Sequence, residues 1–376
     1  MSAHVVIVGN GIAGLTAGDT LRRLGYEGTI TVVGEEPHAT YSRPALSKVA
    51  LAPGDDLDVG TLPAATHGAT ELLGRTVTGL DPANRVATLD DGTELTYDGL
   101  VIATGSHARR FTDSPREYTI RSLDDAARLK ASLVNRPTVT VIGGGPLGME
   151  VASGAVGLGC DVTLIHPGTP MELHLGPLLG GILTRAALEQ GLNIIDSMVS
   201  SVREEGEGMA VTLTDGTVLT SDLVVTAAGD LPNTAWLESS GLLVDGRLIA
   251  DERCRVTDSI VAAGDVVLID RGEGPRRTPI WTAAIEQAKV AAAALIRGDD
   301  ADPLDFQSYF WTDQWGLNLK MSGPIPQGTD PVVVKGSLEE RSAVLHWPES
   351  GTAAALNMRM PIPRLHTLAR TEPATP

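Results

Sequence analysis

Two glycine-rich turns of nearly the same form lie far apart in this chain. The first is GNGIAG, residues 9–14, and the second is GGGPLG, residues 143–148. Each follows a short apolar run, VVIV at 5–8 and TVTVI at 138–142, and each precedes a stretch with the apolar spacing of a helix. A strand, a glycine turn, a helix and a second strand form the unit that binds a dinucleotide. The sequence therefore predicts an α/β fold with two such units.

The similarity continues to the end of each unit. DDGTELTYDGLVIATG, residues 90–105, and TDGTVLTSDLVVTAAG, residues 214–229, both contain a tight DG turn, a strand and a closing glycine. The first copy closes with Ala103, Thr104 and Gly105, and the second with Gly229. We interpret the two units as internal duplicates.

Each glycine of the first turn has a separate role. Gly9 permits the tight turn, Gly11 lets the backbone approach a pyrophosphate, and Gly14 lets the helix and strand pack closely. Glu35 follows 21 residues after Gly14, at the end of the second strand, where a carboxylate accepts hydrogen bonds from an adenosine ribose. The full pattern predicts a complete dinucleotide site.

The second turn keeps the three glycines, Gly143, Gly145 and Gly148, but not the acid. His166 occupies the position that Glu35 holds in the first unit. A mostly neutral imidazole, with an ordinary pKa of about 6.5, neither repels a 2′-phosphate as an acid does nor binds it as an arginine does. We expect weak discrimination between NADH and NADPH, with a slight preference for NADH. A vestigial second site is the alternative.

Composition excludes several other classes of protein. At 376 residues the chain is long enough for two or three domains. Its net charge of −18 argues against nucleic-acid binding, and no apolar run approaches the ~18 residues that span a membrane. Cys160 and Cys254 form no CxxC pair, which excludes dithiol chemistry and fits a reducing cytoplasm. No metal site is expected.

Two dinucleotide units in one chain suit a redox protein in which one unit holds a permanent cofactor and the other admits its reductant. The ATG motif at 103–105 ends one strand, and Gly264-Asp265 ends another, where a ribityl chain can form hydrogen bonds. These positions predict FAD in the first unit and NADH or NADPH in the second.

Seven stretches occur in an order and spacing typical of one family. They are YSRPALSK (41–48), IATGS (102–106), IRSLDDA (120–126), GGGPLGMEVA (143–152), AAGDV (262–266), IWTAAIEQA (280–288) and FWTDQWG (310–316). On these motifs the chain resembles, from end to end, the oxygenase-coupled FAD-dependent NAD(P)H:ferredoxin reductases, the family of putidaredoxin reductase and biphenyl dioxygenase ferredoxin reductase. The resemblance implies an enzyme that passes electrons from NAD(P)H through FAD to a two-iron ferredoxin, which supplies an oxygenase or a cytochrome P450.

The resemblance also implies a glutathione-reductase-like architecture, with two Rossmann-like domains and a small α+β domain. We expect a split FAD-binding domain at 1–108 and 233–302, an NAD(P)-binding domain at 109–232, and a C-terminal interface domain at 303–376. The Pro- and Thr-rich tail beyond about Met358 is expected to be poorly ordered.

The same resemblance implies roles for single residues. It implies that Lys48 stands beside the flavin, where its cationic head stabilises charge on the reduced ring, and that Glu150 faces Lys48 and orients the nicotinamide amide. Asp265 matches the ribityl-binding aspartate, and Trp281 matches a residue placed against the flavin. The other implied FAD-binding positions are Ala13, Glu35, Arg43, Val77 and Arg121.

Two other functions stay open at this point. One is a flavoprotein with a different acceptor, such as rubredoxin, a nitrite-reducing partner or oxygen, and the other is a flavin-binding interaction protein with a decayed nicotinamide site. An acidic ferredoxin would need a local basic surface, because the chain is itself acidic. The candidates are the pairs Arg276-Arg277 and Arg109-Arg110, with Arg277 favoured, or the aromatic region around Trp311 and Trp315.

Overall fold

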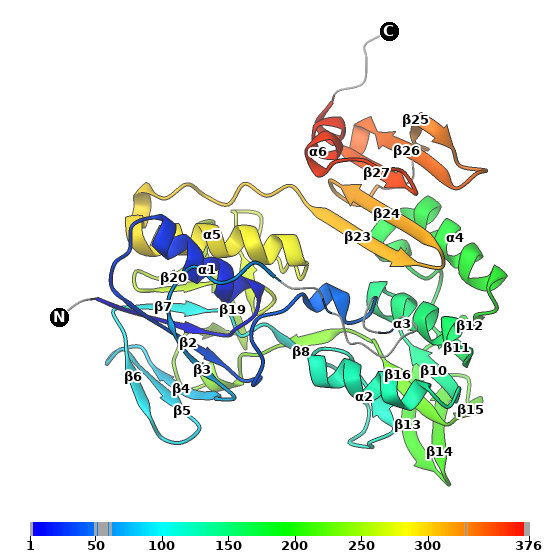
Figure 1. Cartoon of the computed structure of the whole chain (residues 1–376), viewed down its shortest axis with the longest axis horizontal. Coiled ribbons are helices and arrows are strands. Elements are labelled where there is room, and N and C mark those ends of the chain that lie inside the picture. Colours follow the sequence, from blue (N-terminus) through cyan, green and yellow to red (C-terminus); the bar gives the residue numbers. More distant parts are fainter. Residues whose placement is uncertain are drawn as a thin grey trace. The chain divides into compact units, whose positions relative to one another are not determined.

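The computed structural model describes residues 3–48, 51, 59, 62–326, 328 and 330–371. The chain forms two compact units (Figure 1). The first combines 1–42, 60–107 and 231–306, and the second combines 43–59, 108–230 and 307–376. The C-terminal residues thus share a unit with the second glycine turn, while the division into domains by cofactor stays a prediction.

A six-stranded sheet forms the centre of the first unit, in the order β20-β21-β7-β1-β2-β3. β1 pairs in parallel with β2 and β7, and β7 pairs in parallel with β21. The strands are β1 (His4–Val8), β2 (Thr29–Gly34), β3 (Thr70–Leu73), β7 (Gly99–Ile102), β20 (Arg255–Thr257) and β21 (Ile260–Ala262). Two smaller sheets are formed by β4 (Val77–Asp81), β5 (Val86–Leu89) and β6 (Glu94–Thr96), and by β18 (Leu243–Val244), β19 (Arg247–Ala250) and β22 (Val267–Ile269). β8 (Ser106–Ala108) and β17 (Asp230–Pro232) lie where the chain passes from one unit to the other.

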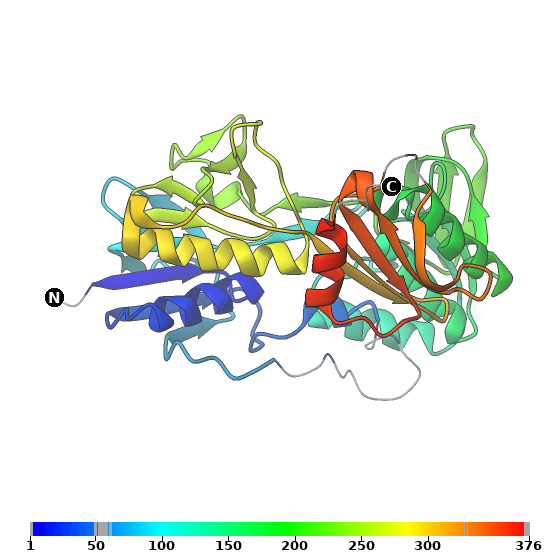
Figure 2. The same ribbon diagram turned by 90° about the horizontal axis from the view of Figure 1, so that it is seen from above.

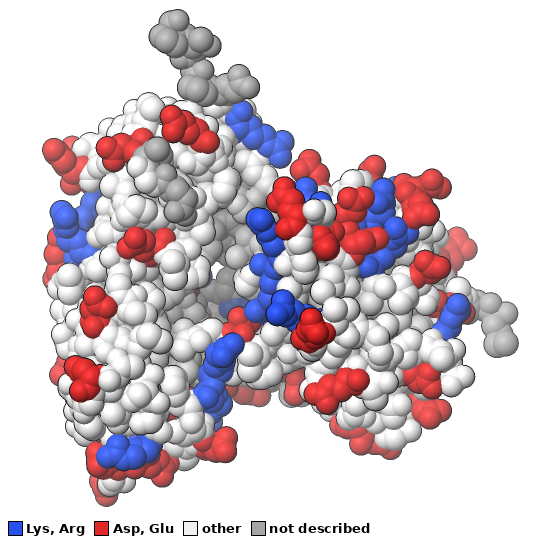
Figure 3. All heavy atoms as spheres, turned by 180° about the vertical axis from the view of Figure 1, so that it is seen from behind, with Lys and Arg blue, Asp and Glu red and all other residues white. Residues whose placement is uncertain are grey.

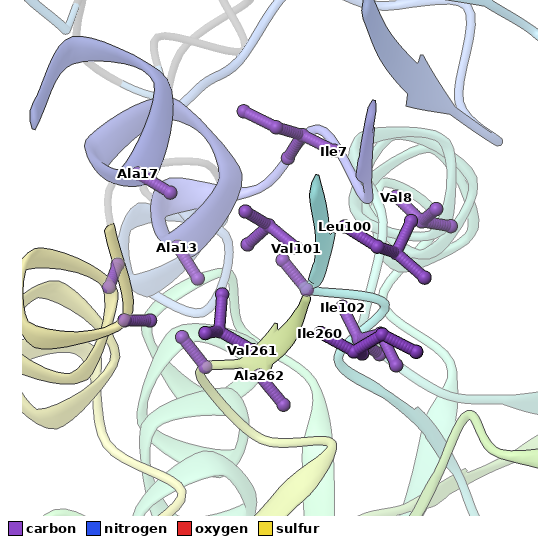
Figure 4. Close-up of a cluster of buried hydrophobic side chains, with 14 of the residues drawn as sticks. Ile7, Val8, Ala13, Ala17, Leu100, Val101, Ile102, Ile260, Val261 and Ala262 are labelled. Atoms are coloured by element: carbon purple, nitrogen blue, oxygen red, sulfur yellow. The ribbon is translucent and has the colours of Figure 1, made fainter. Parts of the chain in front are cut away.

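Helices α1 (Ile12–Arg23) and α5 (Trp281–Arg297) lie side by side in this unit (Figures 1 and 2). Ala13 and Ala17 of α1 belong to the same buried cluster as the strand residues Ile7, Leu100 and Ile102 (Figure 4). Small side chains let the two helices approach closely, as a packed core requires. The buried alanines of α5 are Ala283, Ala284, Ala288, Ala291, Ala292 and Ala294.

The second unit repeats the parallel arrangement, in the strand order β12-β11-β10-β16-β9. Its strands are β9 (Glu117–Tyr118), β10 (Thr138–Ile142), β11 (Asp161–Ile165), β12 (Asn193–Ile195) and β16 (Leu223–Thr226), and its helices are α2 (Leu123–Leu133), α3 (Pro146–Gly157) and α4 (Glu172–Glu189). An antiparallel sheet follows α4, formed by β13 (Val199–Glu205), β14 (Gly208–Leu213) and β15 (Val218–Ser221). The predicted α/β class with two Rossmann-like units is confirmed.

The C-terminal part of the second unit is an antiparallel sheet in the order β23-β24-β27-β26-β25. Its strands are β23 (Tyr309–Gln314), β24 (Leu317–Ser322), β25 (Val332–Ser337), β26 (Ser342–Trp347) and β27 (Thr352–Leu356). Helix α6 (Ile362–Arg370) follows, and its Leu365 and Ala369 are buried with Tyr309, Ala353 and Ala355. The short 3₁₀ helices are η1 (Arg43–Ala45), η3 (Ala235–Leu237), η4 (Gly298–Asp300) and η5 (Pro348–Ser350).

The expected disorder beyond Met358 is therefore wrong for residues 362–370, which form α6. Pro361 and Pro363 suggested an irregular tail. Proline fits the start of a helix, however, because its missing N–H is not needed there. Pro361 caps α6, and Pro363 is its second residue.

The sequence contains 47 acidic and 29 basic residues. Figure 3 shows Asp and Glu side chains spread over the visible face. Among the residues that the structure describes, no helix is both long and apolar enough to cross a membrane.

Candidate functional site

The first glycine turn leaves no room for a Cβ atom at Gly9 or Gly14. Gly9 has a φ of 115°, and a Cβ atom on it would lie 2.1 Å from the carbonyl oxygen of Ala103. A Cβ atom on Gly14 would lie 2.0 Å from the carbonyl oxygen of Gly9. Helix α1 begins after Gly11 with no side-chain cap and no acid in its first turn. Its first N–H groups are therefore suited to an anion such as a pyrophosphate.

The carboxyl ends of the parallel strands bring the other predicted residues of the first unit to one edge of the sheet. Glu35 is exposed directly after β2, and Ala103 follows β7. Gly264, after β21, has a φ of 84°, and a Cβ atom on it would lie 3.3 Å from Cβ of Ala13. In an α/β sheet this edge is where a nucleotide binds.

The remaining predicted residues of the first unit lie around this edge or in the core. The Oγ of Ser106 lies 3.5 Å from Oδ2 of Asp265. Trp281 begins α5 and is half-buried, whereas the side chain of Val77, at the start of β4, is buried in the core. Any contact that Val77 makes to a cofactor would therefore involve its backbone.

Two amide side chains that the sequence did not single out hold this edge together. Asn233 donates from Nδ2 to the carbonyl oxygen of Thr104 at 2.8 Å, and its backbone N–H donates to Gly105 at 3.0 Å. Gln287, buried in α5, accepts a hydrogen bond from the N–H of Gly264 at 2.8 Å. Gln287 lies in the IWTAAIEQA motif, so the motif was the available signal for it.

The second turn repeats the geometry of the first. Gly143 has a φ of 110°, and a Cβ atom on it would lie 2.3 Å from the carbonyl oxygen of Ala227. A Cβ atom on Gly148 would lie 1.8 Å from the carbonyl oxygen of Gly143. Helix α3 begins after Gly145 with no side-chain cap, and Gly229 follows β16 at the same edge of the sheet. Both turns thus fit a dinucleotide backbone, since a Cβ atom would collide at the key positions.

Two histidines border the second turn. A Cβ atom on Gly144 would lie 2.6 Å from the ring of His166, which comes just after β11. A Cβ atom on Gly145 would lie 3.4 Å from the ring of His174, which is in α4. Burial lowers the pKa of His166, partly offset by the carboxylate of Asp196. Burial and the nearby His166 both lower the pKa of His174. At neutral pH, therefore, neither imidazole supplies a full positive charge. The sequence did not predict His174, because only the fold brings α4 to the turn.

Lys48 and Glu150, paired by resemblance, are in contact. The Nζ of Lys48 lies 3.0 Å from Oε2 of Glu150, and their side chains are 13% and 3% exposed. The same Nζ donates to the carbonyl oxygen of Pro44 at 3.1 Å and lies 5.7 Å from the ring centre of Trp311. Ser47 and Thr312 also donate to the Glu150 carboxylate, each at 2.5 Å. The ammonium group of Lys48 thus has Glu150, the carbonyl oxygen of Pro44 and the ring of Trp311 around it.

The predicted arginines divide into structural and exposed groups. Nη1 of Arg43 donates to the carbonyl oxygen of Arg121 at 2.5 Å, so these two predicted FAD-binding residues are neighbours. Arg277 donates from Nε to the carbonyl oxygen of Asp265 at 2.6 Å, and Arg110 donates to that of Glu117 at 2.7 Å. Arg276 instead has a side chain that is 75% exposed.

The two cysteines are unsuited to redox chemistry. Both thiols are free and buried. Burial, and secondarily Asp251, raises the pKa of Cys254 to about 12, and burial raises that of Cys160. A thiolate is the reactive form, so neither residue supplies one near neutral pH. In the described ranges, no group of three or more His, Cys, Asp or Glu residues could hold a metal ion.

Comparison with known proteins identifies the family. Residues 3–293 match the pyridine nucleotide-disulphide oxidoreductase family. The ferredoxin–NAD(+) reductase component of 3-phenylpropionate/cinnamic acid dioxygenase from Photorhabdus laumondii is 32% identical, over 92% of this chain and 90% of that protein. The corresponding component of the anthranilate 1,2-dioxygenase system of Burkholderia cepacia is 36% identical, over 87% and 84%. The crystal structure of a covalent putidaredoxin reductase–putidaredoxin complex superposes with a TM-score of 0.84 at 28% identity, over 97% of this chain and 92% of that one. The chain therefore belongs to the pyridine nucleotide-disulphide oxidoreductase family and, within it, to the ferredoxin–NAD(+) reductase components of oxygenase systems.

Proposed function

We propose that this protein is an FAD-dependent ferredoxin–NAD(+) reductase that takes electrons from NADH or NADPH and passes them to a two-iron ferredoxin serving an oxygenase or a cytochrome P450. The observation that carries the proposal is the presence of two separate turns at which only glycine fits, each at the start of an uncapped helix. The names of the relatives support ferredoxin as the acceptor. The free, buried thiols fit a reducing compartment, so we propose the cytoplasm as the location.

We assign FAD to the first unit. The N–H groups at the start of α1, with Gly9, Gly11 and Gly14, would hold the pyrophosphate. Glu35 would accept hydrogen bonds from the adenosine ribose, and Asp265 would bind the ribityl chain. FAD, when bound, converts a two-electron donation from a nicotinamide into single-electron delivery to an iron–sulfur protein.

We assign the nicotinamide cofactor to the second unit, where the start of α3 would hold its pyrophosphate and His166 would face the adenosine ribose. Lys48 and Glu150 act through charge rather than proton transfer. Glu150 and the carbonyl of Pro44 hold the ammonium group of Lys48 in one position. A fixed charge of this kind stabilises developing negative charge without reorganisation.

Anaerobic stopped-flow absorbance tests this function. The purified protein should be yellow and should release FAD, not FMN, on denaturation. NADH should bleach its visible absorbance rapidly, and the reduced protein should then reduce a two-iron ferredoxin. Failure of both nicotinamides to bleach the flavin would favour the flavin-binding interaction protein. Bleaching without ferredoxin reduction would favour rubredoxin, a nitrite-reducing partner or oxygen as the acceptor.

A further inference from the structure

The carboxylate of Glu150 is held by groups from two distant segments of the second unit. Its Oε2 accepts hydrogen bonds from Ser47 and Lys48, while its Oε1 accepts one from Oγ1 of Thr312 at 2.5 Å. Thr312 lies on β23 and is fully buried. A buried carboxylate needs such donors, because an unsatisfied acceptor in the interior is costly.

The next residue on the same face of β23 fixes the direction of the Thr312 hydroxyl. Gln314 donates from Nε2 to Oγ1 of Thr312 at 2.8 Å, and Gln314 is itself buried. An amide nitrogen can only donate, and a hydroxyl group has one proton. With Oγ1 accepting from Gln314, that proton is directed to Glu150. Gln314 and Thr312 of FWTDQWG thus form a short chain of donors that ends on the Glu150 carboxylate.

The residue that follows β23, Trp315, is also attached to α3, at a point that does not involve Glu150. The backbone N–H of Trp315 donates to Oγ of Ser153 at 2.9 Å, and Nε2 of Gln190 donates to the carbonyl oxygen of Trp315 at 2.8 Å. Ser153 lies three residues after Glu150 on α3, and Trp315 lies three residues after Thr312. The register between strand and helix therefore does not depend on Thr312 alone.

We propose that Thr312, supported by Gln314, is a positioning residue that holds Glu150 in the orientation that fixes Lys48. This inference rests on the proposed function, in which Lys48 and Glu150 assist flavin reduction. Without the Thr312 hydroxyl, Oε1 of Glu150 loses the hydrogen bond that it accepts from β23, and the carboxylate, which Ser47 and Lys48 hold through Oε2, can rotate. Lys48 then loses its fixed position next to Pro44 and Trp311.

A set of matched variants of the FAD-loaded protein tests this. Thr312→Val keeps the shape of the side chain but removes the donor, and Thr312→Ser restores the donor. Ser153→Ala removes the hydrogen bond between α3 and Trp315, the residue after β23, so it controls for a purely structural role. At saturating NADH, we expect Thr312→Val to slow flavin bleaching about tenfold or more, with Thr312→Ser within about threefold and Ser153→Ala within about twofold of the unchanged protein.

A second measurement follows Lys48 directly. Limited labelling with an amine-reactive reagent, read by peptide mapping, should show faster modification of Lys48 in Thr312→Val but not in Ser153→Ala, with Lys320 as the internal reference. Equal rates and equal labelling for Thr312→Val and Ser153→Ala would overturn the inference. Glu150→Gln distinguishes failure of this inference from failure of the proposed function. If flavin bleaching is slow in Glu150→Gln but not in Thr312→Val, only the inference fails. If Glu150→Gln bleaches at the rate of the unchanged protein, the proposed role of the Lys48–Glu150 ion pair fails as well.

Discussion

At the scale of single residues, the geometry of both glycine turns depends on the absence of a Cβ atom. The sequence predicted this at Gly9, Gly14, Gly143 and Gly148, because glycine spacing is a local signal that backbone geometry imposes. The structure adds the atoms that would collide, which are carbonyl oxygens in every case. A carbonyl oxygen in a packed turn cannot move aside as the end of a flexible side chain can.

Gly148→Ala should disable the second site and leave the first intact. Its Cβ would lie 1.8 Å from the carbonyl oxygen of Gly143, so α3 must shift away from the turn. We expect destabilisation by about 1–3 kcal/mol and a large loss of NADH-dependent flavin bleaching, with FAD retained. Stopped-flow absorbance and released-flavin analysis measure the two effects.

Gly157→Ala, at the end of the same helix, is the control for Gly148→Ala. A Cβ at Gly157 meets no atom within 4 Å, so this variant should be neutral or slightly more stable. Normal bleaching by Gly148→Ala would contradict the assignment of this turn to the nicotinamide cofactor.

Because His166 and His174 border the second turn, we expect the preference between NADPH and NADH to change with pH. Burial lowers both pKa values from the ordinary imidazole value, so both imidazoles are neutral at pH 8 and gain protons only at acidic pH. A 2′-phosphate favours the protonated form, so the ratio of kcat/KM for NADPH to that for NADH should stay level from pH 8 to pH 7 and rise as the pH is lowered below the ordinary imidazole pKa. His166→Gln/His174→Gln should make the ratio flat, and His166→Glu should shift preference to NADH at every pH. A pH-independent ratio in the unchanged protein would exclude a role for these imidazoles.

At the scale of elements, strands and turns with a local signature were predictable, whereas contacts between distant segments were not. The β1–α1–β2 and β10–α3–β11 units follow from apolar spacing and glycine position alone. His174 and Thr312 reach their partners only after α4 and β23 have packed in the second unit, and no spacing in the sequence encodes that approach. Helix α6 was missed for a different reason, since the Pro- and Thr-rich composition of the tail indicated poor order, whereas Pro361 and Pro363 lie at the start of the helix.

Leu365→Ala tests whether α6 is part of the core. Leu365 is fully buried with Tyr309 and Ala353, so its truncation should cost about 2–5 kcal/mol and lower Tm. Ile362, on the same helix, is 43% exposed, and Ile362→Ala should change the free energy of unfolding by less than about 0.5 kcal/mol. Denaturant titration of both variants measures the difference. Equal small effects would mean that α6 contributes no packing.

At the scale of the whole molecule, a net charge of −18 constrains how an acidic partner can approach. Long-range repulsion slows encounter unless exposed basic groups lie at the docking surface. Of the pair Arg276-Arg277, Arg277 donates from Nε to the carbonyl oxygen of Asp265, which suits a structural role. The backbone of Arg276 pairs with Ile269, while its side chain is 75% exposed and lies 3.6 Å from the equally exposed Glu273. The structure therefore moves the docking prediction from Arg277 to Arg276.

Arg276→Glu should weaken ferredoxin docking without affecting flavin reduction. We expect the KM for ferredoxin to rise about threefold to tenfold at low salt, with the difference shrinking as ionic strength screens it. The rate of flavin bleaching by NADH should stay unchanged, because Arg276 belongs to neither glycine turn. Arg203→Glu is the matched control, since Arg203 is 51% exposed and the net charge changes by the same amount. If both variants raise the KM equally, total charge rather than a local contact governs encounter, and the docking surface lies elsewhere, with the region around Trp311 and Trp315 the next to test.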